Sequence, residues 1–146
     1  EIFPDAPFIP RPGQINAWDN EEFVKAVDAT GKKQLIIAGI VTDVCVTFCA
    51  LSALEAGYDV FVVTDASGTF DAACRDAAWD RMSRAGVQLV NWFSVVCESH
   101  RDWRNDIEGL GNLLAEFIPD YKNLMTSYAA TSNAGSANRE RLMTRV

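Results

Sequence analysis

The chain has 146 residues, of which 49% are apolar and 23% charged, and its net charge is −7. These values are ordinary for one globular domain with its own core, and we expect a single domain over residues 1–146. A negative chain lacks the basic face that nucleic-acid binding requires, and no apolar run approaches the ~20 residues that span a bilayer. With no signal peptide evident, we expect a cytoplasmic protein that uses neither nucleic acid nor membrane as a partner.

The N-terminal 18 residues predict an extended or looping segment, because they hold four of the five prolines. The first residue is Glu1 rather than Met, so we expect that an upstream part of the protein is missing from this chain. A helix should begin at Asp19, which stands at capping-box spacing from Glu22, and should end at Gly31.

Three short apolar runs then predict strands at 35–40, 60–64 and 87–90, separated by helical patterns at 42–56 and 70–85. Phe70, Ala73, Ala77 and Met82 form the apolar stripe expected for the second helix. Strands that alternate with helices indicate an α/β fold with a parallel sheet, and the apolar composition of these strands favours burial on both faces. Three strands are few for such a sheet, which again predicts missing N-terminal strands.

The C-terminal third predicts helices at about 94–101 and 106–118. Pro119 should end this helical region. The tail from about residue 126 is small and polar, so we expect it to form an arm or a frayed end.

Cys45 is the candidate nucleophile, because it falls in the first turn of a helix that starts at the carboxyl end of a strand. Unpaired amides and the helix dipole at that position favour thiolate over thiol. Ligands of open α/β sheets also bind at the carboxyl ends of strands. The alternative is a buried structural cysteine, which is the commoner role of a free thiol.

The remaining thiols, Cys49, Cys74 and Cys97, predict reduced and mostly buried cysteines. Cys49 lies one helical turn from Cys45, a poor placement for an unstrained disulfide, so a redox protein ranks last among our hypotheses.

Two further polar residues each have two interpretations. Asp65 lies at the end of the second strand, where it either points toward the Cys45 cleft or caps the turn. His100 is the only histidine; it is either a partner for the thiol or a lone surface residue. Cys97 and His100 lack companion ligands, so we expect no metal and no cofactor.

The segment Gly39-Ile40-Val41-Thr42-Asp43-Val44-Cys45-Val46 resembles the nucleophile motif of the isochorismatase-like cysteine hydrolases. Ala53–Val60 and Thr64–Ala66 resemble the helix and strand that follow it in that family. Longer motifs are similar to the YcaC-type branch of the family: Arg11–Trp18, Val63–Phe70, Ala78–Met82, His100–Arg104 and Ile118–Tyr121.

This resemblance implies a three-layer α/β/α fold with a parallel, Rossmann-like sheet of six strands. It implies a Cys–Asp–Lys triad that cleaves an amide, imide or related bond of a small molecule through a covalent cysteine intermediate. Cys45 would be the nucleophile, and the backbone amides of Val41 and Cys45 would form the oxyanion hole. The peptide bond between Ile40 and Val41 would be cis. Assembly into a homo-oligomer, an octamer in this branch, is implied too, with the Trp103 region and the C-terminal tail as subunit contacts.

The chain departs from the family pattern at two positions. Arg11 stands where the family has its lysine, and arginine keeps the charge but is a poor proton donor. The family's aspartate would lie upstream of Glu1, so a catalytically impaired or non-catalytic oligomeric protein is the alternative function. We expect the apolar Phe8, Ile15 and Trp18 to bind substrate, with plain packing as the alternative for Trp18.

Overall fold

A computed structural model describes residues 3–143 of the chain, with the side chains described up to residue 132. The backbone divides into two compact units, residues 1–99 and residues 100–146, and each is described by itself. Among the described helices, none is both long enough and apolar enough to cross a membrane.

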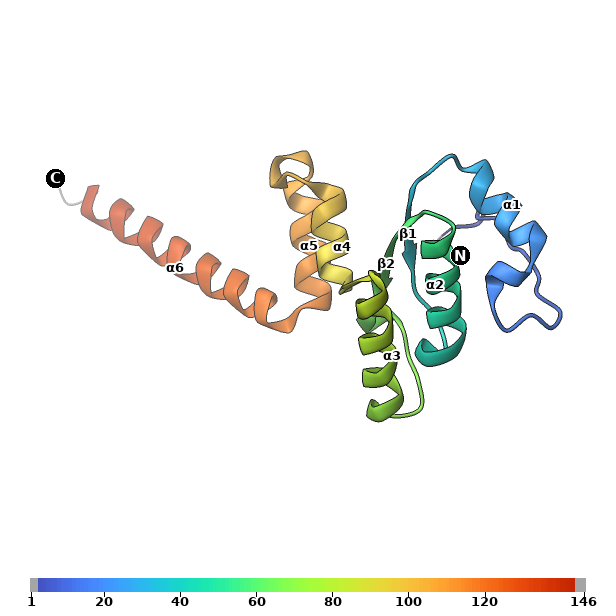
Figure 1. Cartoon of the computed structure of the whole chain (residues 1–146). Helices are drawn as coiled ribbons and strands as arrows, with labels where there is room; N and C mark the ends of the chain where they lie inside the picture. The colour runs from blue at the N-terminus through green and yellow to red at the C-terminus, as the bar shows by residue number, and fades with distance from the viewer. Residues whose placement is uncertain (1–2, 144–146) are drawn as a thin grey trace. The chain divides into compact units, whose positions relative to one another are not determined.

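The first unit is built on a three-stranded parallel sheet (Figure 1). Strands β1 (Gln34–Ile37), β2 (Asp59–Val63) and β3 (Gln88–Val90) lie side by side in the order β1-β2-β3. Leu35 pairs with Val60 on the next strand. The parallel α/β arrangement predicted from the alternating strands and helices is therefore confirmed.

Two helical connections join the strands and cover one face of the sheet. A turn of π-helix (Thr42–Val46) leads into α2 (Thr47–Glu55) between β1 and β2, and α3 (Ala72–Ala85) lies between β2 and β3. Gly86 ends α3 in a left-handed conformation with φ at 106°, which glycine adopts without a steric penalty. The sequence pattern predicted one continuous helix from Thr42; the first turn is instead wider than an α-helix.

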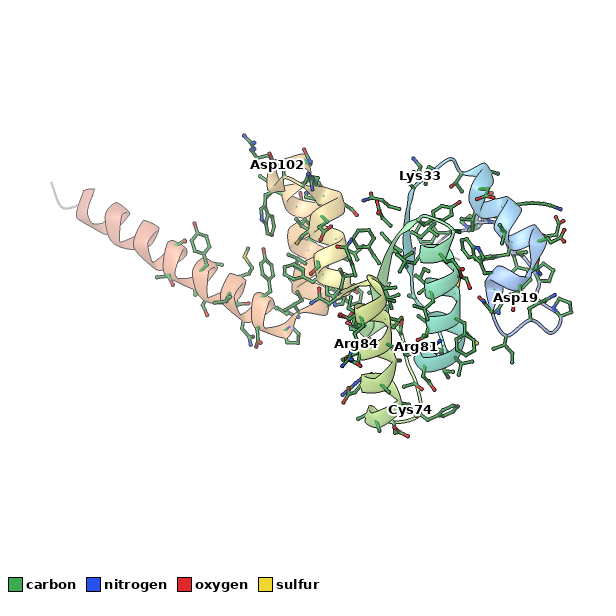
Figure 2. All side chains as sticks on the ribbon, viewed as in Figure 1. Asp19, Lys33, Cys74, Arg81, Arg84 and Asp102 are labelled. Atoms are coloured by element: carbon green, nitrogen blue, oxygen red, sulfur yellow. The ribbon has the colours of Figure 1, made fainter. Side chains whose placement is uncertain are left out.

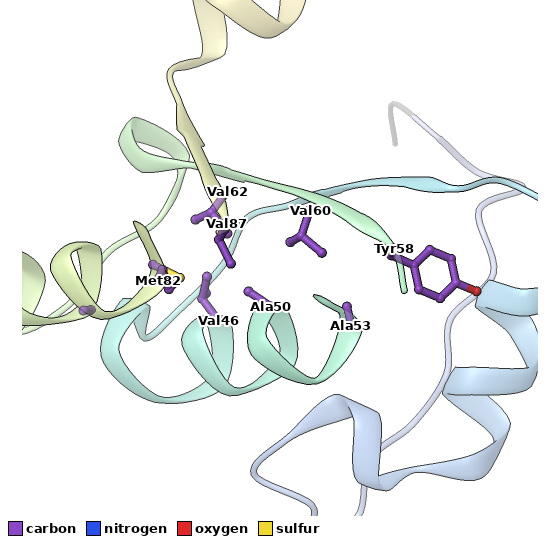
Figure 3. Close-up of a cluster of buried hydrophobic side chains, with 9 residues drawn as sticks. Val46, Ala50, Ala53, Tyr58, Val60, Val62, Met82 and Val87 are labelled. Atoms are coloured by element: carbon purple, nitrogen blue, oxygen red, sulfur yellow. The ribbon is translucent and has the colours of Figure 1, made fainter. Parts of the chain in front are cut away.

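The core lies between these two helices and the sheet, as Figure 3 shows. Small residues of α2 face the strands, which lets the helix backbone approach the sheet closely. The buried cluster comprises Val46, Ala50, Ala53, Tyr58, Val60, Val62, Ala78, Met82 and Val87. Leu35 of β1 packs against this cluster. Because strand side chains alternate, the next residue, Ile36, points to the opposite face of the sheet, where it is 58% exposed. The predicted burial of both faces is therefore wrong for this strand.

The N-terminal region ends in α1 (Glu21–Ala29). Asn20 caps this helix, since its side chain accepts hydrogen bonds from the backbone N–H groups of Glu22 (2.9 Å) and Phe23 (3.1 Å). The capping box predicted for Asp19 is wrong, because Asp19 closes a preceding 3-10 turn and Asn20 is the extended residue before the helix.

Two other predicted boundaries also move. The first strand ends at Ile37 rather than residue 40, and Ile40 contributes only an isolated bridge to Gly68. Phe70 precedes α3 and is 87% exposed, because Asp71 caps that helix by accepting from the Cys74 N–H at 2.8 Å. Phe70 therefore does not belong to the buried helical stripe.

Helix α4 (Trp92–His100) follows β3, and the second unit then contains a 3-10 turn (Trp103–Asn105) and two further helices. Helix α5 (Ile107–Phe117) buries Leu110 and Leu114.

Helix α6 (Pro119–Met143) begins at the proline expected to end the region, since proline is well tolerated in a first helical turn. From about residue 126 the described backbone continues as part of this helix up to residue 143, so the frayed end is wrong there, and an arm stays a prediction. Residues 144–146 of that tail lie outside the described residues.

We predict that Met82→Ala lowers the free energy of unfolding by about 2–5 kcal/mol, because Met82 is fully buried and truncation leaves a cavity. Phe70→Ala is the matched control from the same predicted stripe and should change stability by less than about 0.5 kcal/mol. Urea unfolding of both variants is the measurement. Equal losses would contradict the placement of Phe70 outside the core.

Candidate active site

Cys45 lies in the π turn that follows the carboxyl end of β1. Its thiol is free and half-buried. The peptide bond between Ile40 and Val41, just before this turn, is cis. Single π turns inside helices occur frequently at functional sites, which makes this the first place to look for chemistry.

A second loop, between β2 and α3, holds the backbone on both sides of Val41. Gly68 accepts a hydrogen bond from the Thr42 N–H at 2.8 Å and donates to the Gly39 carbonyl at 3.1 Å. The Ser67 hydroxyl accepts from the Gly39 N–H at 3.3 Å. Backbone just before the Cys45 turn and at its first residue is therefore tied to Ser67 and Gly68.

Side chains add a further link between these loops. The Thr69 hydroxyl donates to the Asp43 carboxylate, which belongs to the π turn. Neither Asp43 nor Thr69 was singled out from the sequence. The sequence offered only a weak indication of this pair: polar residues follow the second strand, and Asp43 lies two residues before Cys45.

The other three thiols differ from Cys45 in their surroundings. Cys49 is 7% exposed, and this burial raises the pKa of its thiol to about 11, against the lowering effect of the Arg11 charge. Cys97 is exposed. Cys74, at the start of α3 in Figure 2, is half-buried, and burial followed by its hydrogen bond to Asp71 raises its pKa. All four thiols are free, but the predicted burial holds only for Cys49.

Arg11 lies in the N-terminal loop, where its guanidinium Nη1 donates to the carbonyls of Gln14 (3.0 Å) and Ile15 (3.1 Å). Its positive charge lowers the pKa of the Cys49 thiol, the smaller of the two influences on that group. The structure therefore brings Arg11 into electrostatic reach of α2, one turn beyond Cys45. Whether it acts on Cys45 itself stays a prediction.

The three apolar residues expected to bind substrate do not share one environment. Phe8 is 87% exposed and Ile15 60% exposed. Trp18 packs edge-on against Tyr58, with 5.7 Å between ring centroids, and against Phe23 at 6.0 Å. The packing role left open for Trp18 is thus present, and a substrate role for all three stays a prediction.

Asp65 acts through its side chain, whereas His100 is held through its backbone, and its half-buried ring has a buried Nε2 without a hydrogen-bond partner among the described residues. The Asp65 carboxylate accepts from the Trp92 N–H at 2.8 Å and so caps α4. The carbonyl of His100 accepts from the Asn105 side chain at 2.8 Å. Across the described residues, no group of three or more His, Cys, Asp or Glu side chains could hold a metal ion.

Comparison with known proteins decides the family. The Isochorismatase domain matches residues 2–93, well over half of the chain. The chain belongs to the Isochorismatase family. The motif around Cys45 and the parallel sheet both fall within this match.

Two YcaC proteins are closely similar to this chain, one of them both as a curated sequence and as a solved structure. The curated Escherichia coli protein named "Probable hydrolase YcaC" is 73% identical over 126 residues, covering 86% of this chain and 61% of that protein. The solved YcaC gene product of E. coli, described as an octameric hydrolase of unknown specificity, is 72% identical with a TM-score of 0.84. YcaC of Pseudomonas aeruginosa, solved with hexane-2,5-diol and covalent acrylamide, is 71% identical with a TM-score of 0.84.

Both solved structures cover 88% of this chain, and the chain covers 63% of each. The chain thus spans about three-fifths of the length of these relatives.

We predict that stability falls as pH rises from about 9 to about 11, because folding raises the pKa of Cys49 to about 11 from the ordinary 9.0. A raised pKa means that the folded state holds the proton more tightly than the unfolded state. The stabilisation from Cys49 is therefore fully present below pH 9 and is lost as the pH rises toward 11. Tyr58 adds to this loss at higher pH, since its hydrogen bond to Asp28 raises its pKa above 10.0.

Urea unfolding at pH 8 and pH 10.5 measures this effect. The parent chain should lose about 1–2 kcal/mol more between the two pH values than Cys49→Ala does. Cys97→Ala, which removes an exposed thiol, is the control and should behave like the parent. The same pH dependence in all three proteins would contradict the assignment to Cys49.

Proposed function

We propose that this chain carries the nucleophile of a cysteine hydrolase that cleaves a C–N bond of the amide or imide type, or a related bond, in a small molecule. Family membership and the close similarity to a protein named as a hydrolase support the reaction class. The observation that carries the proposal is the location of Cys45: a free, half-buried thiol in a π turn at the carboxyl end of a parallel strand.

In the proposed reaction, the Cys45 thiolate attacks the carbonyl carbon and forms a C–S bond while the carbonyl π electrons move to oxygen. The backbone amides of Val41 and Cys45 stabilise this oxyanion. The intermediate then collapses and expels the amine, which leaves with a proton, and water hydrolyses the resulting thioester to release the acid and the thiol.

The backbone around Val41 supports the assigned oxyanion hole. The Val41 carbonyl accepts from the N–H groups of Val44 (3.3 Å) and Val46 (3.2 Å), so the π turn closes directly over it. Within the part of the chain that the structure describes, the Val41 N–H itself has no hydrogen-bond acceptor. An amide without an acceptor is available to a ligand oxygen.

Proton transfer is assigned by family resemblance alone. An aspartate would take the thiol proton, and Arg11 would hold negative charge on the thiolate or substrate. Arginine stays protonated, so we assign it no proton transfer. No cofactor enters the scheme.

A non-catalytic oligomeric protein is the second candidate function, and the arrangement of Arg11 favours it. Nη1 of its guanidinium donates to two carbonyls of its own loop, those of Gln14 and Ile15. The relative described as octameric supports self-association of this chain into a homo-oligomer, an octamer by analogy. In that case Cys45 would take no part in catalysis.

We predict that acrylamide at pH 7 labels Cys45 faster than Cys97, although Cys97 is the more exposed thiol. A nucleophilic thiol in a helix-start turn adds to the activated double bond faster than a thiol on the open surface. Peptide mapping by mass spectrometry after timed labelling gives both rates in one sample. Cys49 should remain unlabelled, and preferential labelling of Cys97 would sink the nucleophile assignment.

We further predict that ammonia release from a panel of small primary amides, if catalysed by this chain, falls at least 100-fold in Cys45→Ser, because serine is a far weaker nucleophile. Arg11→Lys should raise the rate, since lysine can exchange a proton. Enzyme-coupled ammonia detection is the assay. Preferential labelling of Cys45 with no amide turned over would favour the non-catalytic alternative.

A further inference from the structure

The stretch Ser67-Gly68-Thr69 contacts the Cys45 turn from the neighbouring loop, and its last residue does so through a side chain. We propose that Thr69 is a positioning residue for Cys45, acting through its hydrogen bond to Asp43. This inference rests on the proposed function, because Cys45 needs a fixed orientation only if it reacts. Across the described residues, Thr69 makes no hydrogen bond to the thiol or to the proposed oxyanion donors.

The π turn has few anchors of its own. Val41, the residue before it, makes no side-chain capping bond. Inside the turn, the Thr47 hydroxyl donates to the Thr42 carbonyl at 2.6 Å, which stiffens the turn but does not fix its orientation. The core burial of Val46 anchors the end of the turn, and bonds to other elements set the orientation of its first half.

Two bonds supply that orientation, and both end in the same loop. The Thr42 N–H donates to the Gly68 carbonyl at 2.8 Å, and the Asp43 carboxylate accepts from the Thr69 hydroxyl. Together with the core burial of Val46, these two bonds at successive residues hold the first half of the turn. Asp43 is two residues before Cys45, so a pivot there moves the thiol directly.

The surroundings of the Asp43 carboxylate support this role. Its charge adds a small contribution to the raised pKa of Cys74, after burial and Asp71, so the carboxylate lies within electrostatic reach of the first turn of α3. Both partners of the Thr69–Asp43 bond are half-buried, where an unpaired carboxylate is more costly than at an open surface. Loss of the Thr69 donor would therefore reorient Asp43, and with it the π turn.

The loop residues just before Thr69 are hydrogen-bonded to the sheet. The Ser67 hydroxyl donates to the Val63 carbonyl at the end of β2 at 2.8 Å and accepts from the Gly39 N–H at 3.3 Å. Thr69 is thus tied through Ser67 to the central strand of the sheet. The Cys45 turn takes its orientation from β2, although it follows β1 in sequence.

Acrylamide labelling of Thr69→Val and Thr69→Ser tests the proposal, with Cys97 as the internal reference thiol. Valine keeps the shape of threonine without the donor, and serine keeps the donor. The Cys45/Cys97 rate ratio at pH 7 should fall at least five-fold in Thr69→Val and stay within two-fold of the parent in Thr69→Ser. A parental ratio in Thr69→Val, or an equal loss in Thr69→Ser, would overturn the role of the hydroxyl.

The same bond can be tested from its other end, which covers a failure of Thr69→Val to fold. Asn at position 43 still accepts from Thr69, so Asp43→Asn should keep the ratio, whereas Asp43→Ala should lower it as Thr69→Val does. Loss in both variants would show that the carboxylate charge matters rather than the bond, and the proposal would be wrong.

Amide hydrogen exchange of peptides covering 42–46 separates this inference from the proposed function. Exchange should be at least three-fold faster in Thr69→Val than in the parent and unchanged in Thr69→Ser, whether or not Cys45 reacts with acrylamide. Faster exchange with an unreactive Cys45 would reject the hydrolase but keep the positioning role. Parental exchange in Thr69→Val would reject the positioning role.

Discussion

The close contact between α2 and the sheet is the constraint on which the arrangement around Cys45 depends. Ala50 and Ala53 are fully buried, and their small side chains let the helix lie directly on β2. A helix held this closely has little freedom to rotate. The π turn that precedes it must therefore make up any mismatch between the end of β1 and the fixed direction of α2.

The buried face of α2 also distinguishes two cysteines that the sequence places one turn apart. Cys49 is buried in the helix proper, and its thiol keeps its proton until strongly alkaline pH. Cys45 lies in the wider turn and remains half-buried. A regular helix over the whole segment would have stacked these two thiols on one face. The change of helix type at Thr47 gives them different environments.

The sequence contained enough to predict the strands and the order of the elements, because continuous apolar runs bounded by glycines leave few alternatives. It was less informative wherever a single polar contact decides a boundary. Asn20 and Asp19 are both good capping residues, and only the 3-10 turn before them determines which one caps α1. Phe70 fits a helical stripe by spacing, yet the capping bond made by Asp71 excludes it from the helix. The spacing of apolar residues does not indicate where either helix begins.

For the site, the sequence singled out Cys45 through its place after a strand, and family resemblance added Val41 and Arg11. Thr69 could not be found in this way, because its partner Asp43 lies 26 positions away and belongs to another element. Contacts of this kind depend on strand register, which here aligns the ends of β1 and β2. A residue-by-residue reading does not reveal them.

Tyr58 links the N-terminal segment to the core. Its hydroxyl donates to Asp28, its ring packs against Trp18, and its backbone N–H donates to the Ala53 carbonyl at 3.1 Å. Within the same N-terminal segment, the Asn20 side chain donates a hydrogen bond to the carbonyl of Pro10, next to Arg11, at 3.2 Å. The Arg11 loop also joins α2 directly, because the Asn16 side chain donates to the Ser52 hydroxyl at 3.0 Å. A change at Tyr58 or at Asn16 can therefore alter how the Arg11 charge acts on Cys49 while every charged and nucleophilic group stays in place.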